Sequence, residues 1–217
     1  MIRSTKVLEK RLIERYSGRL TRFGDDPRTL GWDTVAHQRT RFLAALGLVK
    51  VAGKAVLDIG CGFGDFLSLL KERGLGHASY LGVDINRDLL AVARAKHGDA
   101  RFSRRNLYDQ PFARPVCDVG FMFGVLNFKL ERPTNEDWSR TLIRNAFKAC
   151  REALAVDMLS SQRDASYPKE DFVHYSDPCR MLEWAFTLTP HATLRHDYAS
   201  IPQREFILVL RRTPEVL

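Results

Sequence analysis

The feature that most constrains this chain is a glycine-rich turn that directly follows a short apolar run. The run 55–59 is predicted to form a buried strand, and Gly60, Gly62 and Gly64 follow it at alternate positions. Glycine lets the backbone turn tightly and approach a flat ligand where a Cβ atom would clash. A strand that leads into such a turn is typical of α/β folds that bind ligands at the strand end.

Short apolar runs alternate with amphipathic stretches from Lys54 to Arg151, which predicts repeated strand-helix units. The strands that we expect span 55–59, 80–84, 101–103, 118–123, 153–159, 192–196 and 205–210. The expected helices span 65–73, 87–97, 134–150 and about 178–186. We therefore predict a Rossmann-like α/β fold. Its seven-stranded, mostly parallel sheet has helices on both faces and an antiparallel C-terminal hairpin strand.

The N-terminal region is predicted to be a helical extension of this sheet. The 217 residues suit one large domain with such an extension. We expect a first helix, a linker over 16–31 that is rich in Gly, Arg and Asp, and a second helix near 33–46. The predicted domains are a helical cap or lid over 1–50 and a nucleoside-binding domain over 51–217.

Composition narrows the class of protein. An apolar fraction of 45% excludes a disordered chain. No apolar run is long enough for a membrane span, and Met1–Lys10 lacks the apolar stretch of a secretory signal, so we expect a cytoplasmic protein. The net charge of +8 comes from Arg and Lys scattered along the chain, so nucleic acid is an unlikely partner. Four cysteines without ligand spacing, Cys61, Cys117, Cys150 and Cys179, predict free thiols and no metal site.

Two acids next to the glycine turn indicate the charge of its ligand. Asp58 stands two residues before Gly60, where it would repel a pyrophosphate, and position 65 is Asp rather than the Gly of a phosphate loop. Asp84 ends the next predicted strand, 20 residues after Gly64, where a carboxylate can bind two ribose hydroxyls. A ligand with a ribose, a positive charge and no phosphate fits S-adenosylmethionine.

With these residues the chain resembles the class I S-adenosylmethionine-dependent methyltransferases, over roughly 54–210. The resemblance implies that the glycine turn lies against the methionine moiety, that Asp84 binds the ribose and that Asn106 accepts a hydrogen bond from the adenine amino group. Asn106 replaces the Asp that is commoner in the family, but its carbonyl can also accept. The cofactor residues that it implies are Asp58, Gly60, Cys61, Gly62, Gly64, Asp84, Ile85, Asn106, Leu107, Phe123 and Gly124.

Two polar residues of the second N-terminal helix are further candidates for the cofactor site. Gln38 and Arg41 lie one helical step apart and could reach the methionine carboxylate, although a surface pair on an amphipathic helix is at least as good an interpretation. Trp32, just before that helix, is predicted to belong to the core.

The predicted catalytic residues lie beyond the fourth and fifth strands. The polar stretch 157–177 follows the fifth strand at the ligand-binding edge of the sheet. There His174 could take a proton from an acceptor hydroxyl or amine, with Tyr175 orienting it, although a lone His is more often a bystander. Asn127 is the third candidate, because the run Gly124–Asn127 resembles a narrower bacterial group found in polysaccharide and natural-product contexts.

Three functions stay open on the sequence. The first is methyl transfer to a small-molecule acceptor of secondary metabolism. The second is cyclisation of the cofactor with release of methylthioadenosine, as in an azetidine-2-carboxylate-forming lyase. The third is a nucleic-acid-binding module or an RNA methyltransferase. The last is weakened because the fourth strand lacks the Asn/Asp-Pro-Pro-aromatic signature of nucleobase methylation. The sequence leaves open the acceptor atom and the oligomeric state.

Overall fold

The computed structural model describes residues 2–163, 169–198 and 205–215. Its strands are β1 (Ala55–Ile59), β2 (Ser79–Asp84), β3 (Arg101–Arg104), β4 (Cys117–Met122), β5 (Cys150–Leu159), β6 (Ala192–Arg195) and β7 (Glu205–Arg211). Its helices are α1 (Ile2–Phe23), the 3₁₀ turn η1 (Pro27–Leu30), α2 (Val35–Leu46), α3 (Asp65–Glu72), α4 (Arg87–Lys96), α5 (Asn135–Ala149) and α6 (Pro178–Ala185). Parts of two predicted segments, 164–168 and the turn 199–204, lie outside the described residues.

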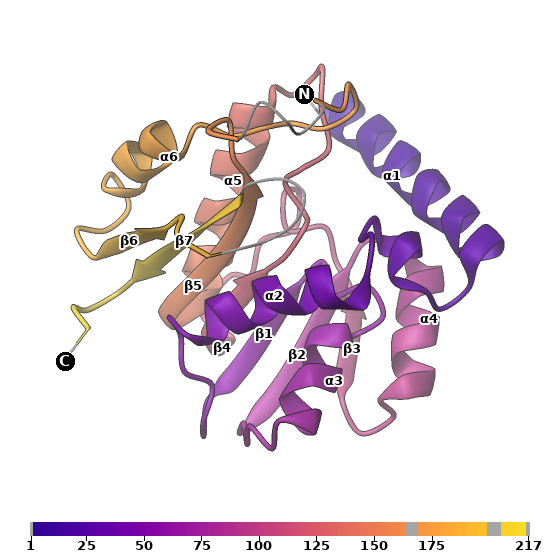
Figure 1. The fold of residues 1–217 in the computed structure, drawn as a ribbon, viewed down its shortest axis with the longest axis horizontal. Helices are drawn as coiled ribbons and strands as arrows, with labels where there is room; N and C mark the ends of the chain where they lie inside the picture. Colours follow the sequence, from indigo (N-terminus) through magenta and orange to yellow (C-terminus); the bar gives the residue numbers. More distant parts are fainter. Residues whose placement is uncertain (1, 164–168, 199–204, 216–217) are drawn as a thin grey trace.

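In these described ranges the strands form one seven-stranded sheet in the order β3-β2-β1-β4-β5-β7-β6, with helices on both faces (Figure 1). Strands β1 to β5 pair in parallel, and β7 runs antiparallel to both β5 and β6. The predicted fold class is confirmed. Strand β1 lies between β2 and β4. The chain passes from β1 to β2 on one side and later reaches β4 on the other side, so the loops that follow β1 and β4 run in opposite directions and leave a crevice between them.

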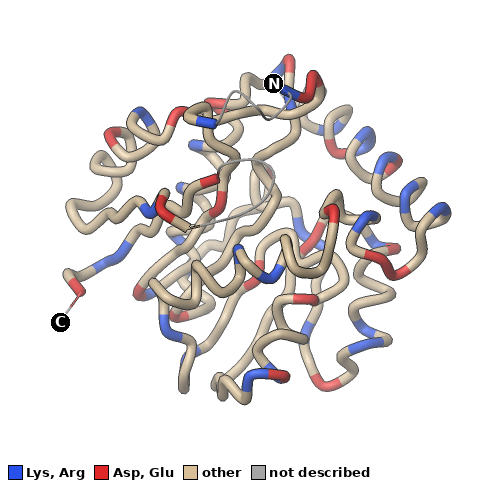
Figure 2. Tube along the Cα trace, viewed as in Figure 1, with Lys and Arg blue, Asp and Glu red and all other residues tan. Residues whose placement is uncertain are grey.

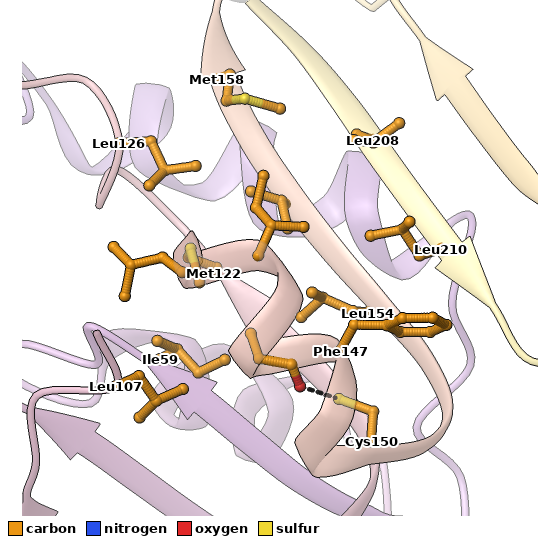
Figure 3. Close-up of a cluster of buried hydrophobic side chains, with 14 of the residues drawn as sticks. Ile59, Leu107, Met122, Leu126, Phe147, Cys150, Leu154, Met158, Leu208 and Leu210 are labelled. Carbon is orange, nitrogen blue, oxygen red and sulfur yellow. Dashed lines mark hydrogen bonds between the residues drawn. The ribbon is translucent and has the colours of Figure 1, made fainter. Parts of the chain in front are cut away.

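Two apolar cores hold the sheet between its helices. On one face, aromatic rings of α2, α3, β4 and the residue after β4 pack in edge-to-face and tilted pairs, with the ring centroid of Phe66 about 5 Å from those of Phe42, Phe121 and Phe123. The other core holds α5 and α6 against the sheet, and Figure 3 shows Phe147 of α5 beside Leu154 of β5. The central strands are therefore buried on both faces, which explains their almost unbroken apolar sequence.

Helix α1 differs from the prediction, because the linker expected over 16–31 was wrong. The helix continues through Gly18 to Phe23, and η1 follows it. Asn86 fixes the helix to the sheet: its Nδ2 donates to the Ile13 carbonyl and to Ser17 Oγ. Ser17 Oγ donates in turn to Asp88 on α4 at 2.6 Å. A glycine inside a helix costs about 1 kcal/mol, which these tertiary contacts outweigh.

We predict that Asn86→Ala lowers the free energy of unfolding by more than a substitution that removes only a helix cap. The Asn86 side chain is 1% exposed and caps α4 by accepting from the backbone N–H groups of Asp88 and Leu89, in addition to its bonds to α1. Thr134→Ala is the matched control, since within the described residues the hydrogen bonds given for the Thr134 side chain are with Asp137 of its own helix α5. Urea unfolding is expected to show a loss about 1 kcal/mol larger for Asn86→Ala. Equal losses would contradict the proposed attachment of α1.

Candidate active site

A cavity, called here the first cavity, lies at the carboxyl ends of β1, β2 and β4 and is closed on one side by α1. Most of the predicted cofactor residues line it. They are Gln38, Asp58, Gly60, Cys61, Gly62, Asp84, Ile85, Asn106, Leu107, Phe123 and Gly124. Gly64 and Arg41 are not among its lining residues: Gly64 caps α3, and Arg41 lines a second cavity described below.

Asp58 is the buried acid of this cavity. The carboxyl group is 2% exposed and accepts a short hydrogen bond from the Tyr80 hydroxyl on β2. Burial raises the pKa of Asp58 to about 7; the bond from Tyr80 opposes this rise and the charge of Asp84 adds to it. A cation in the first cavity would therefore favour the ionised form of this carboxyl.

Asp84 lies at the end of β2 and fixes the glycine turn. Its Oδ2 accepts from the backbone N–H of Gly62 at 3.0 Å, and its Oδ1 accepts from that of Asn86 at 2.8 Å. Burial raises the pKa of Asp84, and these backbone bonds oppose the rise. Each carboxylate oxygen keeps acceptor capacity for a second donor, which suits a ligand with two neighbouring hydroxyls.

The turn after β1 accepts only glycine at its first position. Gly60 has a φ of +72°, and a Cβ atom there would overlap the Val125 side chain. The backbone N–H groups of Gly60 and Cys61 both donate to the Val83 carbonyl on β2, so the turn is held against the neighbouring strand. The turn therefore presents backbone without side chains of its own at its glycine positions, and it lies between Asp58 and Asp84 in the wall of the cavity.

Helix α1 supplies residues that the sequence analysis missed. Glu9, Leu12 and Tyr16 line the first cavity at helical spacing. Glu9 accepts from Asn106 Nδ2 at 2.8 Å, while Asn106 Oδ1 accepts from the backbone N–H of Tyr108 at 3.0 Å. The amide of Asn106 is thus oriented by a carboxylate 97 residues away in the chain, a contact that local sequence patterns do not reveal.

Arg41 belongs to a buried ionic cluster beside the cavity. Its guanidinium pairs with Glu205 at the start of β7 and lies 3.7 Å from Asp157 Oδ2 on β5. Asp157 Oδ1 accepts from the backbone N–H of Gly124 at 2.6 Å. Burial raises the pKa of Asp157 to about 6, and the Arg41 charge opposes the rise. Trp32 lies under the guanidinium of Arg41, with Cζ 4.6 Å from the ring centroid.

The second cavity adjoins the first. Both share five lining residues, Tyr16, Leu30, Trp32, Gly124 and Phe128. Trp32 is only half-buried and lines both cavities, so its assignment to the core was incomplete. Asn127 lines the second cavity and its Oδ1 accepts from the Leu159 N–H at 3.0 Å. His37 also lines it, with Nδ1 3.5 Å from Asp33.

His174 and Tyr175 lie behind the wall of the second cavity and are not among its lining residues. The backbone N–H of His174 donates to the Asn127 carbonyl at 3.0 Å, and burial lowers the pKa of its imidazole, an effect that Glu136 opposes. The Tyr175 hydroxyl accepts from the backbone N–H of Glu170 at 3.2 Å. These contacts fasten residues 170–176 to the loop after β4.

No cluster of three or more His, Cys, Asp or Glu side chains suited to a metal ion occurs in the part of the chain that the structure describes. Among the described helices, none is long and apolar enough to cross a membrane.

The fold and the first cavity together define an α/β protein with a nucleoside-type site, and comparisons with known proteins are consistent with this. Residues 56–156 match the family model described as "Methyltransferase domain". Rv1506c of Mycobacterium tuberculosis, whose name describes it as a methyltransferase, is 26% identical over 73% of this chain and 93% of its own length. The ubiquinone/menaquinone biosynthesis C-methyltransferase UbiE of Xylella fastidiosa is 30% identical over 67% of this chain, but the match spans 58% of UbiE.

Solved structures share the fold at low sequence identity. The magnesium protoporphyrin IX methyltransferase ChlM of Synechocystis, with bound S-adenosylhomocysteine, has a TM-score of 0.67 at 13% identity and covers 96% of this chain and 100% of its own. The DhpI complex with S-adenosylhomocysteine has a TM-score of 0.61 at 17% identity, over 95% of both chains. Residues 56–156 therefore match a methyltransferase domain, and the chain has the fold of class I S-adenosylmethionine-dependent methyltransferases.

The residues that line the first cavity fit S-adenosylmethionine chemically. Two carboxylates, the buried Asp58 and the half-buried Asp84, flank the glycine turn, and Arg105 is the basic residue that lines the cavity. An ammonium group matches Asp58, and a ribose diol matches Asp84 with its remaining acceptor capacity.

We predict that the affinity for S-adenosylhomocysteine, the demethylated product, depends on pH through Asp58. Since the pKa of Asp58 in the free protein is about 7, the carboxyl is protonated at lower pH and must lose its proton to bind an ammonium group. Titration calorimetry should show affinity falling below pH 7, by up to about tenfold per pH unit. Asp58→Asn is expected to bind more weakly with a flat profile. A flat wild-type profile between about pH 6 and pH 8 would refute the assignment.

Proposed function

We propose that this enzyme transfers a methyl group from S-adenosylmethionine to a small-molecule acceptor that occupies the second cavity. The observation that carries the proposal is the shared wall: Trp32, Gly124 and Phe128 line both cavities. A methyl group held at this border has the cofactor site on one side and a separate, partly enclosed space on the other. In-line displacement requires this kind of arrangement, with the acceptor opposite the departing sulfur.

Each part of the first cavity has a role in this proposal. Asp58 binds the ammonium group, Asp84 binds the ribose, and Asn106, oriented by Glu9, accepts from the adenine amino group. Phe123 and Gly124 shape the path of the methyl. The cofactor supplies a methyl bonded to a positively charged sulfur, so the protein contributes mainly position and exclusion of water. The N-terminal region 1–50 acts as the cap, because α1 and α2 both contribute lining residues.

Proton transfer from the acceptor is assigned differently from the sequence prediction. Asn127 lines the second cavity and can orient an acceptor. His37 is an imidazole of that cavity and its Nδ1 lies 3.5 Å from a carboxylate oxygen of Asp33, and we propose His37 as the proton acceptor. His174 and Tyr175 stay predictions as catalytic groups; their described contacts support a positioning role for the wall.

A small acceptor is better supported than a nucleic acid. Helix α5 carries Arg140, Arg144 and Lys148 at steps of four residues, and Arg140 pairs with Glu136, which neutralises part of this charge. The guanidinium groups of Arg140 and Arg144 also lie about 6 Å from the ring centroid of Trp184 on α6 rather than standing apart from the surface. The names of the matched relatives refer to quinone biosynthesis and to a porphyrin, which supports a metabolite or natural product as acceptor. Free thiols, three of them buried, are in keeping with the proposed cytoplasmic location.

We expect incubation with isotope-labelled S-adenosylmethionine and a host metabolite extract to yield S-adenosylhomocysteine and one labelled small molecule. Mass spectrometry of the products distinguishes the alternatives. Methylthioadenosine formed without an acceptor would contradict methyl transfer and support cyclisation of the cofactor. Label recovered in a nuclease-sensitive fraction would support an RNA acceptor instead.

We also predict that Gly124→Ala blocks transfer while cofactor binding survives. Gly124 has a φ of +69°, and a Cβ there would lie 2.9 Å from Cζ2 of Trp32, at the border of the two cavities. Gly53→Ala is the matched control, because Gly53 has the same φ of +69° but no atom within 4 Å of the added Cβ. Both variants carry the backbone strain, about 1 kcal/mol. Turnover in the extract assay should fall at least about tenfold only for Gly124→Ala. Equal turnover in the two variants would contradict the proposal that the methyl group is transferred at the border of the two cavities.

A further inference from the structure

The second cavity contains more positive charge than its carboxylates neutralise. Four arginines line it: Arg15, Arg19, Arg28 and Arg41. Two of them have carboxylate partners. Arg28 binds both oxygens of Asp26, at 2.8 and 3.0 Å, and Arg41 belongs to the buried cluster described above.

The other two arginines, Arg15 and Arg19, lie one helical turn apart on α1. In the described part of the chain, neither has a carboxylate oxygen within 4.0 Å of a guanidinium nitrogen. Arg19 Nε donates to the carbonyls of Arg28 and Thr29, at 2.9 and 3.2 Å, and its Nη2 also donates to the Arg28 carbonyl, which leaves Nη1 to donate to a ligand. Burial and then the neighbouring Arg15 charge lower the pKa of Arg19. Figure 2 shows the basic residues that follow one another along α1.

Aromatic rings hold the Arg15 guanidinium beside the cavity. Its Cζ lies 5.1 Å from the ring centroid of Phe172 and 5.5 Å from that of Phe128. Both rings line the second cavity, and Phe172 is 49% exposed although it is a large apolar side chain. The backbone N–H of Lys129 donates to the Phe172 carbonyl at 2.9 Å, so the two rings come from segments that are bonded together. The arginine keeps its in-plane N–H donors available because the rings contact its face.

The acids that line the cavity do not cancel these two charges. Asp33 and Glu170 are its lining carboxylates, and both residues are exposed. The carboxylate of Asp33 is 74% exposed and lies beside His37, not beside Arg15 or Arg19. Charges in solvent are screened far more than charges in a partly enclosed cavity.

We propose that the second cavity selects an acceptor with an anionic group, a carboxylate or a phosphate, which Arg15 and Arg19 bind while Phe128 and Phe172 contact its apolar body. The inference rests on the proposed function and names the substrate class of that same site. Arginine is suited to this role because its planar donors match two oxygens of either anion. Phe128 also lines the first cavity, so an apolar body against this ring lies toward the methyl donor.

The test uses three probes of one shape: benzoate, phenyl phosphate and the neutral benzyl alcohol. Each is titrated by calorimetry or by protein-observed NMR into the full chain saturated with S-adenosylhomocysteine. We expect at least one anion to bind at least tenfold more tightly than benzyl alcohol. Benzoate and phenyl phosphate distinguish a carboxylate from a phosphate. Equal affinity for the neutral probe, or no binding of either anion at millimolar concentration, would overturn the inference.

Variants assign the effect to the two arginines. We expect Arg15→Gln and Arg19→Gln each to weaken binding of the preferred anion about tenfold or more, which corresponds to about 1.4 kcal/mol. Arg11→Gln is the matched control on the same helix, because Arg11 is exposed and lines neither cavity. The three variants should bind S-adenosylhomocysteine within about twofold of the wild type, which shows that α1 is in place.

The two proposals fail in distinguishable ways. A wild-type protein that does not bind S-adenosylhomocysteine would overturn the proposed function and with it the assignment of an acceptor site. Intact binding of S-adenosylhomocysteine with anion affinity unchanged in both Arg15→Gln and Arg19→Gln would overturn only the anionic acceptor.

Discussion

The arrangement of the two cavities depends on one buried cation. Arg41 is 6% exposed and lies between Asp157 of β5 and Glu205 of β7. These two carboxylates of the sheet therefore neutralise a buried charge that comes from α2. Removing either partner of a buried pair leaves an uncompensated charge, which typically costs several kcal/mol. The pair therefore specifies where α2 lies. Through Asp157 it also fixes the Gly124 N–H, and through Trp32 it fixes the wall that both cavities share.

The acids of the first cavity show how burial prepares a site for a cation. Asp58 is buried and Asp84 is half-buried at the ends of neighbouring strands, and removal from solvent raises the pKa of each. A protonated acid in an empty cavity becomes a carboxylate when a positive ligand arrives, so the energetic cost of burying the charge falls when the ligand binds. Backbone N–H groups keep Asp84 partly compensated, whereas Asp58 has the single hydroxyl of Tyr80 and responds more strongly.

The sequence reveals the parts of the structure that local physics determines. The glycine turn, Asp58 and Asp84 were predictable because strand, turn and helix follow one another within a few residues and each has its own pattern. Glu9, Arg15 and Tyr16 were not predictable as site residues, since their importance comes from where α1 crosses the sheet. The attachment of α1 depends on Asn86, more than 60 residues away. The extent of α1 was missed for the same reason: Gly18 suggests a break, and only tertiary contacts outweigh it.

Helix α1 also explains why the two cavities share one wall. Glu9, Leu12 and Tyr16 face the first cavity, and Arg15, Tyr16 and Arg19 face the second, so one side of the helix passes from one site to the other at Tyr16. This side carries Glu9, Arg15 and Arg19 beside the apolar Leu12, so a search for an apolar stripe overlooks it. A shift of α1 changes both cavities together. If the proposed function holds, the residues that distinguish one acceptor from another are carried by a helix whose position the first cavity already requires.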